Sequence, residues 1–531
     1  MNCKHRSPRG GRLSEHGKAV VILFFLFIIS NYGIAQNLMA KRWLLGAARV
    51  SQIVFNDTTK PIMKILYPYP PTVHYSHGGH SNICDSATGK LLFSTNGMIL
   101  YDSAGNIMDN GDNLVDNKLY THNAFPCSFT TQSSLIIPKG NNGLYYVFIT
   151  SVSDSLYNWY WTGASGLPKA PFDRLEYSVV DINQNIGLGK VVTKRQKLLQ
   201  GIELHKPMMQ ACRHSNGTDW WLLKQGEYDT NRIYRFLVKA DTIEGPWVQN
   251  FSAPKYLAYD ISGQFCFNHD GTKFASVQGK GVTNKLFIAD FDRCTGELNN
   301  PQIVNIPIDS TTHAPLDNQG KLDSVNVGVC FSPNGQFIYI SKWYNIYQYE
   351  YQQTDSVLAW YRIQHGPDTT IQEFQRYSHL YIGNDGRTYI GYQSGLAYEG
   401  SVINKPDIKG AGCEFCRKCV RLTDTIGLGN GWGYTSPPNM PDYNLGASGV
   451  VCWPVGLPNP PKEGEGQLEV YPNPANNKLK IENGELKMKE LYNSVGQLLF
   501  STKVNEIDVS RFSAGVYYLK CGTAVRKINI E

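Results

Sequence analysis

Six stretches of the chain repeat one pattern: an apolar strand, a short polar turn and a second apolar strand. They span residues 83–93, 135–148, 211–223, 264–277, 329–340 and 380–390. Each turn contains a glycine that usually follows Asn or Asp, and both members of such a pair tolerate the positive φ of a hairpin turn. These glycines recur 51 to 74 residues apart, at Gly89, Gly143, Gly217, Gly271, Gly335 and Gly386. The pattern predicts six β-hairpins.

The strands that follow these hairpins are rich in aromatic residues, for example 286–291 and 346–351. About four strands in every 40–60 residues, repeated six or seven times, are typical of a β-propeller, whose blades bury both faces. A pair of β-sandwiches that share hairpin chemistry is the alternative. Because the turn glycines are regularly spaced, we predict an all-β chain with a propeller of six or seven blades.

Three longer motifs support the propeller. Residues 267–274 read Phe-Asn-His-Asp-Gly-Thr-Lys-Phe, residues 331–338 read Phe-Ser-Pro-Asn-Gly-Gln-Phe-Ile, and residues 291–298 read Phe-Asp-Arg-Cys-Thr-Gly-Glu-Leu. This part of the chain resembles the blades of WD-repeat and YVTN-type propellers, although the Trp-Asp dipeptide is missing. The resemblance implies a propeller over most of residues 41–455.

The first 35 residues have the order of a secretory signal. A basic stretch ends at Lys18, an apolar run covers 19–29, and small residues follow at Gly33 and Ala35. The apolar run is too short to span a bilayer comfortably, which needs about 20 residues. We therefore predict cleavage between Ala35 and Gln36 rather than an uncleaved anchor, and the mature chain contains no later apolar span.

The C-terminal segment is set apart by residues 456–467, which are rich in Pro, Gly and charge. After this linker come the motifs 468–475, 491–499, 507–510, 513–519 and 526–530. The series resembles the type A sorting domain of type IX secretion cargo, a compact Ig-like β-sandwich. The resemblance implies that the type IX translocon is a partner, and that the protein crosses the periplasm to the outer surface or the medium.

The same resemblance marks the residues on which sorting is expected to depend: Tyr471, Pro472, Asn473, Pro474, Gly496, Gly515, Tyr517 and Lys527. At Gly515 we expect a backbone conformation or a close approach that a side chain would obstruct. The predicted domains are a signal at 1–35, a propeller at 36–455, a linker at 456–467 and a sorting domain at 468–531.

Composition agrees with an exported β-protein. The chain is 42% hydrophobic and 12% aromatic, which allows a sizeable core and favours strands. Its net charge is +6, and residues 1–35 contribute +4, so the exported chain is left with +2. That balance offers no electrostatic argument for binding nucleic acid.

Three cysteines in one segment could hold a metal ion. Cys413, Cys416 and Cys419 have the spacing of zinc or iron–sulfur ligands, and Cys452 is the nearest later cysteine. An exported protein meets oxidising surroundings, which favour disulfides. We therefore expect disulfides or free thiols and no metal; the eleven cysteines that follow Cys3 leave at least one thiol over.

Two further clusters allow two interpretations each. His74, His77 and His80 could converge on a metal from a loop, but loop histidines are more often solvated. The aromatic residues of 157–161 could stack on sugar rings, or they could pack between blades.

No catalytic motif is present: the chain lacks a nucleophile elbow, a zinc-protease motif and a P-loop. Asp85, Asp270 and Asp385 lie at turns, where they are expected to stabilise hairpins. We predict a non-enzymatic module that binds a glycan or a protein, without a cofactor. The alternative is a secreted hydrolase or lyase, which carboxylates or histidines converging at the propeller axis would favour.

Overall fold

The computed structural model describes the greater part of the chain, in separate stretches. These are residues 37–45, 51–55, 62–65, 78–122, 128, 130–161, 172–226, 232–251, 263–278, 284–307, 326–364, 376–392, 399–421, 436–450, 452, 469–482, 488–493, 498–521 and 524–531. The predicted signal, its cleavage site at Ala35 and Gln36, and the linker at 456–467 lie outside them.

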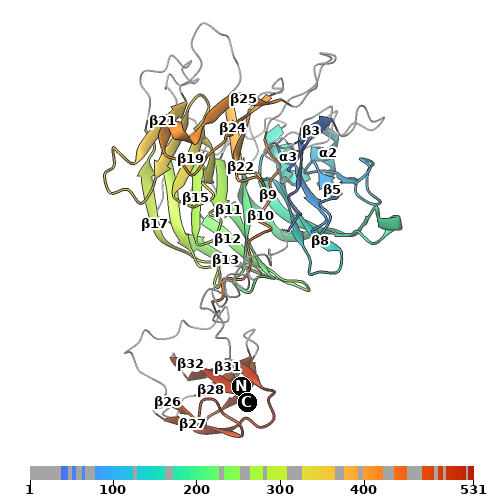
Figure 1. Cartoon of the computed structure of the whole chain (residues 1–531). Coiled ribbons are helices and arrows are strands. Elements are labelled where there is room, and N and C mark those ends of the chain that lie inside the picture. Colours follow the sequence, from blue (N-terminus) through green and yellow to red (C-terminus); the bar gives the residue numbers. More distant parts are fainter. Residues whose placement is uncertain are drawn as a thin grey trace, which may run out of the picture.

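The main domain is built from antiparallel sheets arranged around an axis (Figure 1). The first two described sheets have three strands each: β1 (Arg42–Leu45), β2 (Ser51–Val54) and β3 (Ile62–Ile65), then β4 (Ser81–Cys84), β5 (Leu91–Thr95) and β6 (Leu100–Asp102). The last three have four strands each: β14 (Gly263–Phe267), β15 (Lys273–Gln278), β16 (Lys285–Phe291) and β17 (Leu298–Asn305); β18 (Asn326–Phe331), β19 (Phe337–Lys342), β20 (Ile346–Glu350) and β21 (Trp360–Gln364); β22 (Tyr377–Ile382), β23 (Thr388–Tyr392), β24 (Glu399–Ile403) and β25 (Phe415–Arg421).

Between these groups, one long strand joins two blades into a seven-stranded sheet. Its strands are β7 (Ser134–Pro138), β8 (Leu144–Ser151), β9 (Phe172–Asp181), β10 (Lys190–Arg213), β11 (Trp220–Gly226), β12 (Arg232–Val238) and β13 (Ile243–Asn250). The first part of β10 pairs with β9, and the part after Leu204 pairs with β11. The strand therefore ends one blade and begins the next, so the described strands form seven blades.

The ring closes where the first blade meets the last. Trp43 of β1 packs edge-to-face on Tyr389 of β23, with ring centroids 5.4 Å apart. On its other side, the backbone N–H of Leu44 donates to the side chain of Asn82 on β4, at 3.0 Å. Aromatic packing of this kind contributes beyond the area that it buries, so it helps to hold the two ends of the ring together.

All six predicted hairpins are confirmed. They are β4–β5, β7–β8, β10–β11, β14–β15, β18–β19 and β22–β23. Each predicted turn glycine has a positive φ, between 66° and 79°. The turn aspartates act as expected: the Asp85 carboxylate accepts from the Thr88 backbone at 2.7 Å, and Asp270 and Asp385 accept from the backbone two residues on. Because β4–β5 and β18–β19 lie in different sheets of a ring, the sandwich alternative is wrong.

The short helices lie outside the repeat. They are α2 (Asn117–His122), α3 (Asp154–Trp161) and the 3₁₀ turns η1 (Asn185–Gly187) and η2 (Gly410–Cys413). The aromatic cluster at 157–161 belongs to α3 rather than to a strand, and Tyr157 is buried in the largest core cluster. The side chains of 159–161 lie outside the described residues.

A segment without regular structure crosses the propeller axis. We call residues 436–446 the strap; its first five residues are all buried. Asn439 lies at its centre, where its backbone N–H donates to the His80 carbonyl at 3.0 Å and its carbonyl accepts from the Ser81 hydroxyl at 2.7 Å. The strap thus joins the second blade from a position 358 residues further along the chain.

Four side-chain amides fill the axis beside the strap. We call Gln132, Gln210, Gln264 and Asn439 the amide plug. The Asn439 amide nitrogen donates to the carbonyls of Ser134 and Met209, at 2.9 and 3.2 Å, and its oxygen accepts from Gln210 at 3.0 Å. Gln132 bonds both the N–H and the C=O of Phe265, each at 2.9 Å. Inward-facing backbone groups of several blades are thereby satisfied.

The C-terminal domain has its own core. One sheet contains β26 (Glu469–Tyr471), β27 (Lys478–Glu482) and β30 (Glu506–Asp508); the other contains β28 (Lys489–Asn493), β29 (Leu498–Thr502), β31 (Gly515–Cys521) and β32 (Ala524–Ile530). Apolar and polar positions alternate in β27, where Leu479 and Ile481 are buried and their neighbours are exposed. Buried residues of both sheets form one cluster, separate from the propeller clusters.

We predict that Asn439→Ala destabilises the propeller. The change removes the bonds of Asn439 to the buried carbonyls of Ser134 and Met209 and to the Tyr381 hydroxyl, and each buried group left without a partner costs about 1–3 kcal/mol. Thermal and urea unfolding of the exported protein should therefore show a loss of about 3 kcal/mol. Asn444→Ala, an exposed position on the same strap, is the control and should change stability little. Equal stability of both variants would contradict the role of the plug.

Candidate functional site

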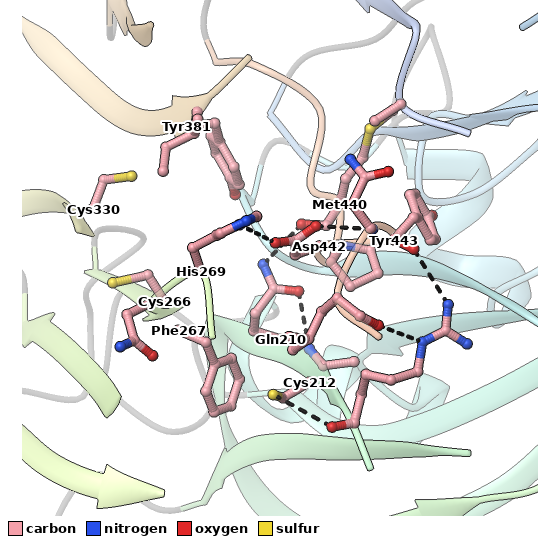
Figure 2. A pocket seen from close by; sticks show the side chains of 18 of the residues that line it. Gln210, Cys212, Cys266, Phe267, His269, Cys330, Tyr381, Met440, Asp442 and Tyr443 are labelled. Atoms are coloured by element: carbon pink, nitrogen blue, oxygen red, sulfur yellow. Dashed lines mark hydrogen bonds and ion pairs between the residues drawn. The ribbon is translucent and has the colours of Figure 1, made fainter. Parts of the chain in front are cut away.

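A cavity lies at the axis, on the face where the hairpin turns gather. Its volume is about 680 Å³, and we call it the funnel. Turn residues of four blades line its rim, and Pro438 with residues 440–446 of the strap lines one wall. Gln210, Tyr381 and Met440 surround its deep end (Figure 2). The funnel ends at the amide plug, because the Tyr381 hydroxyl donates to Asn439 at 3.2 Å.

The charged groups of the funnel all make hydrogen bonds. Arg213 donates to the strap carbonyls of Tyr443 and Leu445, both at 3.3 Å, and its guanidinium lies 3.9 Å from the ring centre of Trp220. Burial lowers the pKa of Arg213 to about 10, so the group stays charged at neutral pH. At the rim, His269 Nδ1 and Asp442 Oδ2 are 2.8 Å apart (Figure 2). The charged groups are therefore engaged with the protein itself, and the rest of the wall presents hydrogen-bonding and apolar groups.

Three cysteines occupy the same position on successive blades of the funnel. Cys212, Cys266 and Cys330 each lie five residues before a turn glycine, and each is buried (Figure 2). Burial raises the pKa of all three thiols, that of Cys330 to about 12. A thiol is a strong nucleophile only as the thiolate, so these groups are unsuited to nucleophilic attack.

The buried histidines near the axis are structural. His379 lies within 2.8 Å of the Thr131 hydroxyl and 3.0 Å of the Gly263 carbonyl, and burial lowers its pKa to about 4. His80 is buried as well, with Nε2 3.1 Å from the Leu44 carbonyl. His74 and His77, the other members of the predicted cluster, lie outside the described residues.

The structure separates the three cysteines of the 413–419 segment. Cys416 and Cys419 form a disulfide, whereas Cys413 is a buried thiol in a different core cluster. The nearest later cysteine, Cys452, forms a disulfide with Cys294 in the turn before β17. No group of three or more His, Cys, Asp or Glu in the described ranges is arranged to hold a metal ion.

An arginine and a disulfide fasten the end of the strap. Arg293 donates to the carbonyls of Arg213 and Asp270, at 2.9 and 3.1 Å, and also to the Gly446 carbonyl. The neighbouring Cys294 is disulfide-bonded to Cys452, six residues beyond the strap. The motif read at 291–298 as a blade end therefore also anchors the strap.

The sorting residues that the structure describes have structural roles. Asn473 donates to the Lys527 carbonyl at 3.0 Å and accepts from the Asn529 backbone at 2.8 Å. Pro472 and Pro474 flank it as exposed residues, and the Tyr471 hydroxyl contacts Glu482. The Tyr517 hydroxyl donates to the Ser513 carbonyl at 2.7 Å. Gly496 lies outside the described residues.

The expectation for Gly515 is wrong. Its φ is not in the left-handed region, and a Cβ there would meet its nearest atom at 3.7 Å, an ordinary contact. Gly515 is an exposed residue at the start of β31, where extended backbone needs no glycine.

The strap, its Asn439 and Asp442, and the plug glutamines were not found from the sequence. One signal was present: in two hairpins a glutamine stands two residues before the cysteine, at Gln210 and Gln264. Side chains two apart on a strand share a face, so this repeat marks a position that faces the axis.

The rim pair predicts a pH dependence. The hydrogen bond to Asp442 raises the pKa of His269 above 6.5. The pair therefore stabilises the strap fully below pH 6.5, while Asp442 is ionised, and loses its effect as the pH rises through the raised pKa. Because the groups are partly exposed, we expect about 0.5 kcal/mol. NMR titration should give His269 a pKa above 6.5 that Asp442→Asn lowers; an unchanged value would contradict the pair.

Comparisons with known proteins identify the C-terminal domain. Residues 469–530 match the family described as the secretion system C-terminal sorting domain. No curated protein matches the chain. No helix in the described part of the chain is long and apolar enough to cross a membrane.

Solved structures similar to the chain include a protein from Lactobacillus plantarum, at 12% identity and a TM-score of 0.39, covering 74% of this chain and 98% of that one. The periplasmic gluconolactonase PpgL of Pseudomonas aeruginosa matches at 11% identity and a TM-score of 0.34, with 92% and 98% covered. Kluyveromyces lactis Hsv2 matches at 7% and 0.33, with 69% and 90% covered. The propeller assignment rests on the sheets described above. The C-terminal match adds that this β-propeller protein carries a type IX sorting domain, which directs it to the outer surface or the medium.

Proposed function

We propose that the exported propeller is a non-enzymatic binding module and that its funnel takes a glycan. The observation that carries this proposal is the closed axis, where neutral amides stand in place of catalytic carboxylates or histidines. A ligand in the funnel would meet hydrogen-bonding groups and apolar surface, which together suit an uncharged polar ligand.

The size of the cavity favours a glycan over a protein surface. A volume of about 680 Å³ lies within the usual range of small-ligand sites, whereas protein partners bind broader and flatter surfaces. Phe267 and Met440 supply apolar contact to the faces of a sugar ring. The side chains of Asn384 and Asn444, which bond no other described residue, are available to its hydroxyls.

The hydrolase alternative has less support. Hydrolysis of a glycosidic bond ordinarily uses two carboxylates about 5–10 Å apart. Asp442 is the one acidic residue among the described residues that line the funnel, and it is engaged by His269. The cysteine thiols are protonated, so they offer no nucleophile in its place.

We predict that the double change Asn384→Ala and Asn444→Ala weakens glycan binding about thirtyfold, because two hydrogen bonds of about 1 kcal/mol each are lost. A glycan array with the exported protein would identify the ligand, and calorimetry would measure its affinity. The control is Asn299→Ala, exposed on the outer strand β17. If the double variant bound the glycan as tightly as the unchanged protein, the funnel would not be the binding site. Release of a cleaved sugar would favour the hydrolase.

We predict that deletion of residues 468–531 stops export without unfolding the propeller. The C-terminal core cluster shares no residue with the propeller clusters. In the native host, the truncated chain should accumulate in the periplasm with the melting temperature of the full propeller. Cell fractionation and thermal unfolding measure the two effects. Normal surface delivery would contradict the sorting role, and collapse of the propeller would contradict its independence.

A further inference from the structure

The two edges of the four-stranded sheet in the sorting domain differ. Its strand order is β29-β28-β31-β32. The β32 edge is covered: Asn473 bonds the backbone at Lys527 and Asn529, and Ala475 exchanges backbone hydrogen bonds with Asn529 and Glu531, at 2.8 and 3.0 Å. The motif residue Asn473 thus blocks this edge to any further strand.

The β29 edge is open in the described part of the chain. β29 pairs with β28 on one side, and no described strand pairs with it on the other. Its five residues, Leu-Leu-Phe-Ser-Thr, include no charge. Natural sheets usually protect an open edge with Lys, Pro or a very short strand, because unpaired backbone groups invite another strand to add.

Two consecutive leucines are exposed on this edge. Leu498 and Leu499 keep 49% and 37% of their surface accessible. Consecutive residues of a regular strand point to opposite faces. Here the pairing register with β28 shifts between Phe500 and Leu498, and such a shift changes the direction of the side chains, so both leucines can be exposed. The edge therefore combines free backbone groups with two apolar anchors, the combination that strand addition uses.

We propose that β29 is the docking edge of the sorting domain, and that its occupant is an extended strand of the type IX export machinery. The domain matches a family of secretion sorting domains, so recognition by that machinery is its role. Of the two edges of this sheet, Asn473 covers one, and β29 remains for the partner. The absence of protective charges on β29 fits an edge kept open for a specific strand.

Charged substitutions in the full chain test this proposal in the native host. Leu498→Lys and Leu499→Lys should each lower the ratio of surface to periplasmic protein about tenfold, since a charge at an apolar anchor opposes docking. Met488→Lys is the matched control, with 46% of the side chain exposed but outside β29. Export of both β29 variants at the level of the control would overturn the proposal.

A second measurement separates docking from folding. A photoreactive phenylalanine analogue at Leu499 preserves the apolar character of the edge and should crosslink to a component of the type IX translocon. The same group at Met488 should not. Crosslinking at Met488 and not at Leu499 would overturn the proposal. This result would hold even if the lysine variants are folded, as judged by their resistance to protease. Pairing of two copies through β29, seen as a dimer that Leu499→Lys abolishes, would also overturn it by assigning the edge to self-association.

Discussion

The structure depends on how a ring of blades satisfies the inner edges of its innermost strands. Each such strand pairs on its outer side only, and the backbone groups that face the axis are too buried to be left without partners. Here they bond to side-chain amides. Gln264 accepts from the N–H groups of Val329 and Leu380 and donates to the Leu380 carbonyl, so a single side chain serves two blades. An amide is suited to this task because it offers both a donor and an acceptor.

The use of side-chain amides at the axis also limits which charged groups can lie there. Asn439 comes from the strap, so the strap brings both the last partner of the inner strands and one wall of the funnel. A charged residue in that place would need a partner of its own in a buried region, at a cost that neutral amides avoid. The funnel is consequently neutral at its deep end, and its charged groups, Arg213 and the His269–Asp442 pair, lie nearer the rim and are held by hydrogen bonds.

The hairpins and the sorting domain were predictable because their signals are local. A turn glycine, a neighbouring Asn or Asp and alternating apolar residues each constrain the backbone within a few positions, and Gly271 with Asp270 is an example. The strap has no such pattern: its partners lie up to 406 residues away, and only the folded ring brings Asn37 to Tyr443 and Ser81 to Asn439. For the same reason, the spacing of Cys413, Cys416 and Cys419 could not reveal which sulfurs would meet.

The disulfide between Cys294 and Cys452 joins a blade to the segment that follows the strap. The strap is synthesised after every blade, and contacts between such distant residues form late in folding. The sorting domain follows Cys452 and is synthesised later still. Every chain that carries the sorting domain therefore also contains the strap that crosses the propeller axis. A chain truncated before the strap, whose axis would stay without its last partner, would lack the sorting domain too.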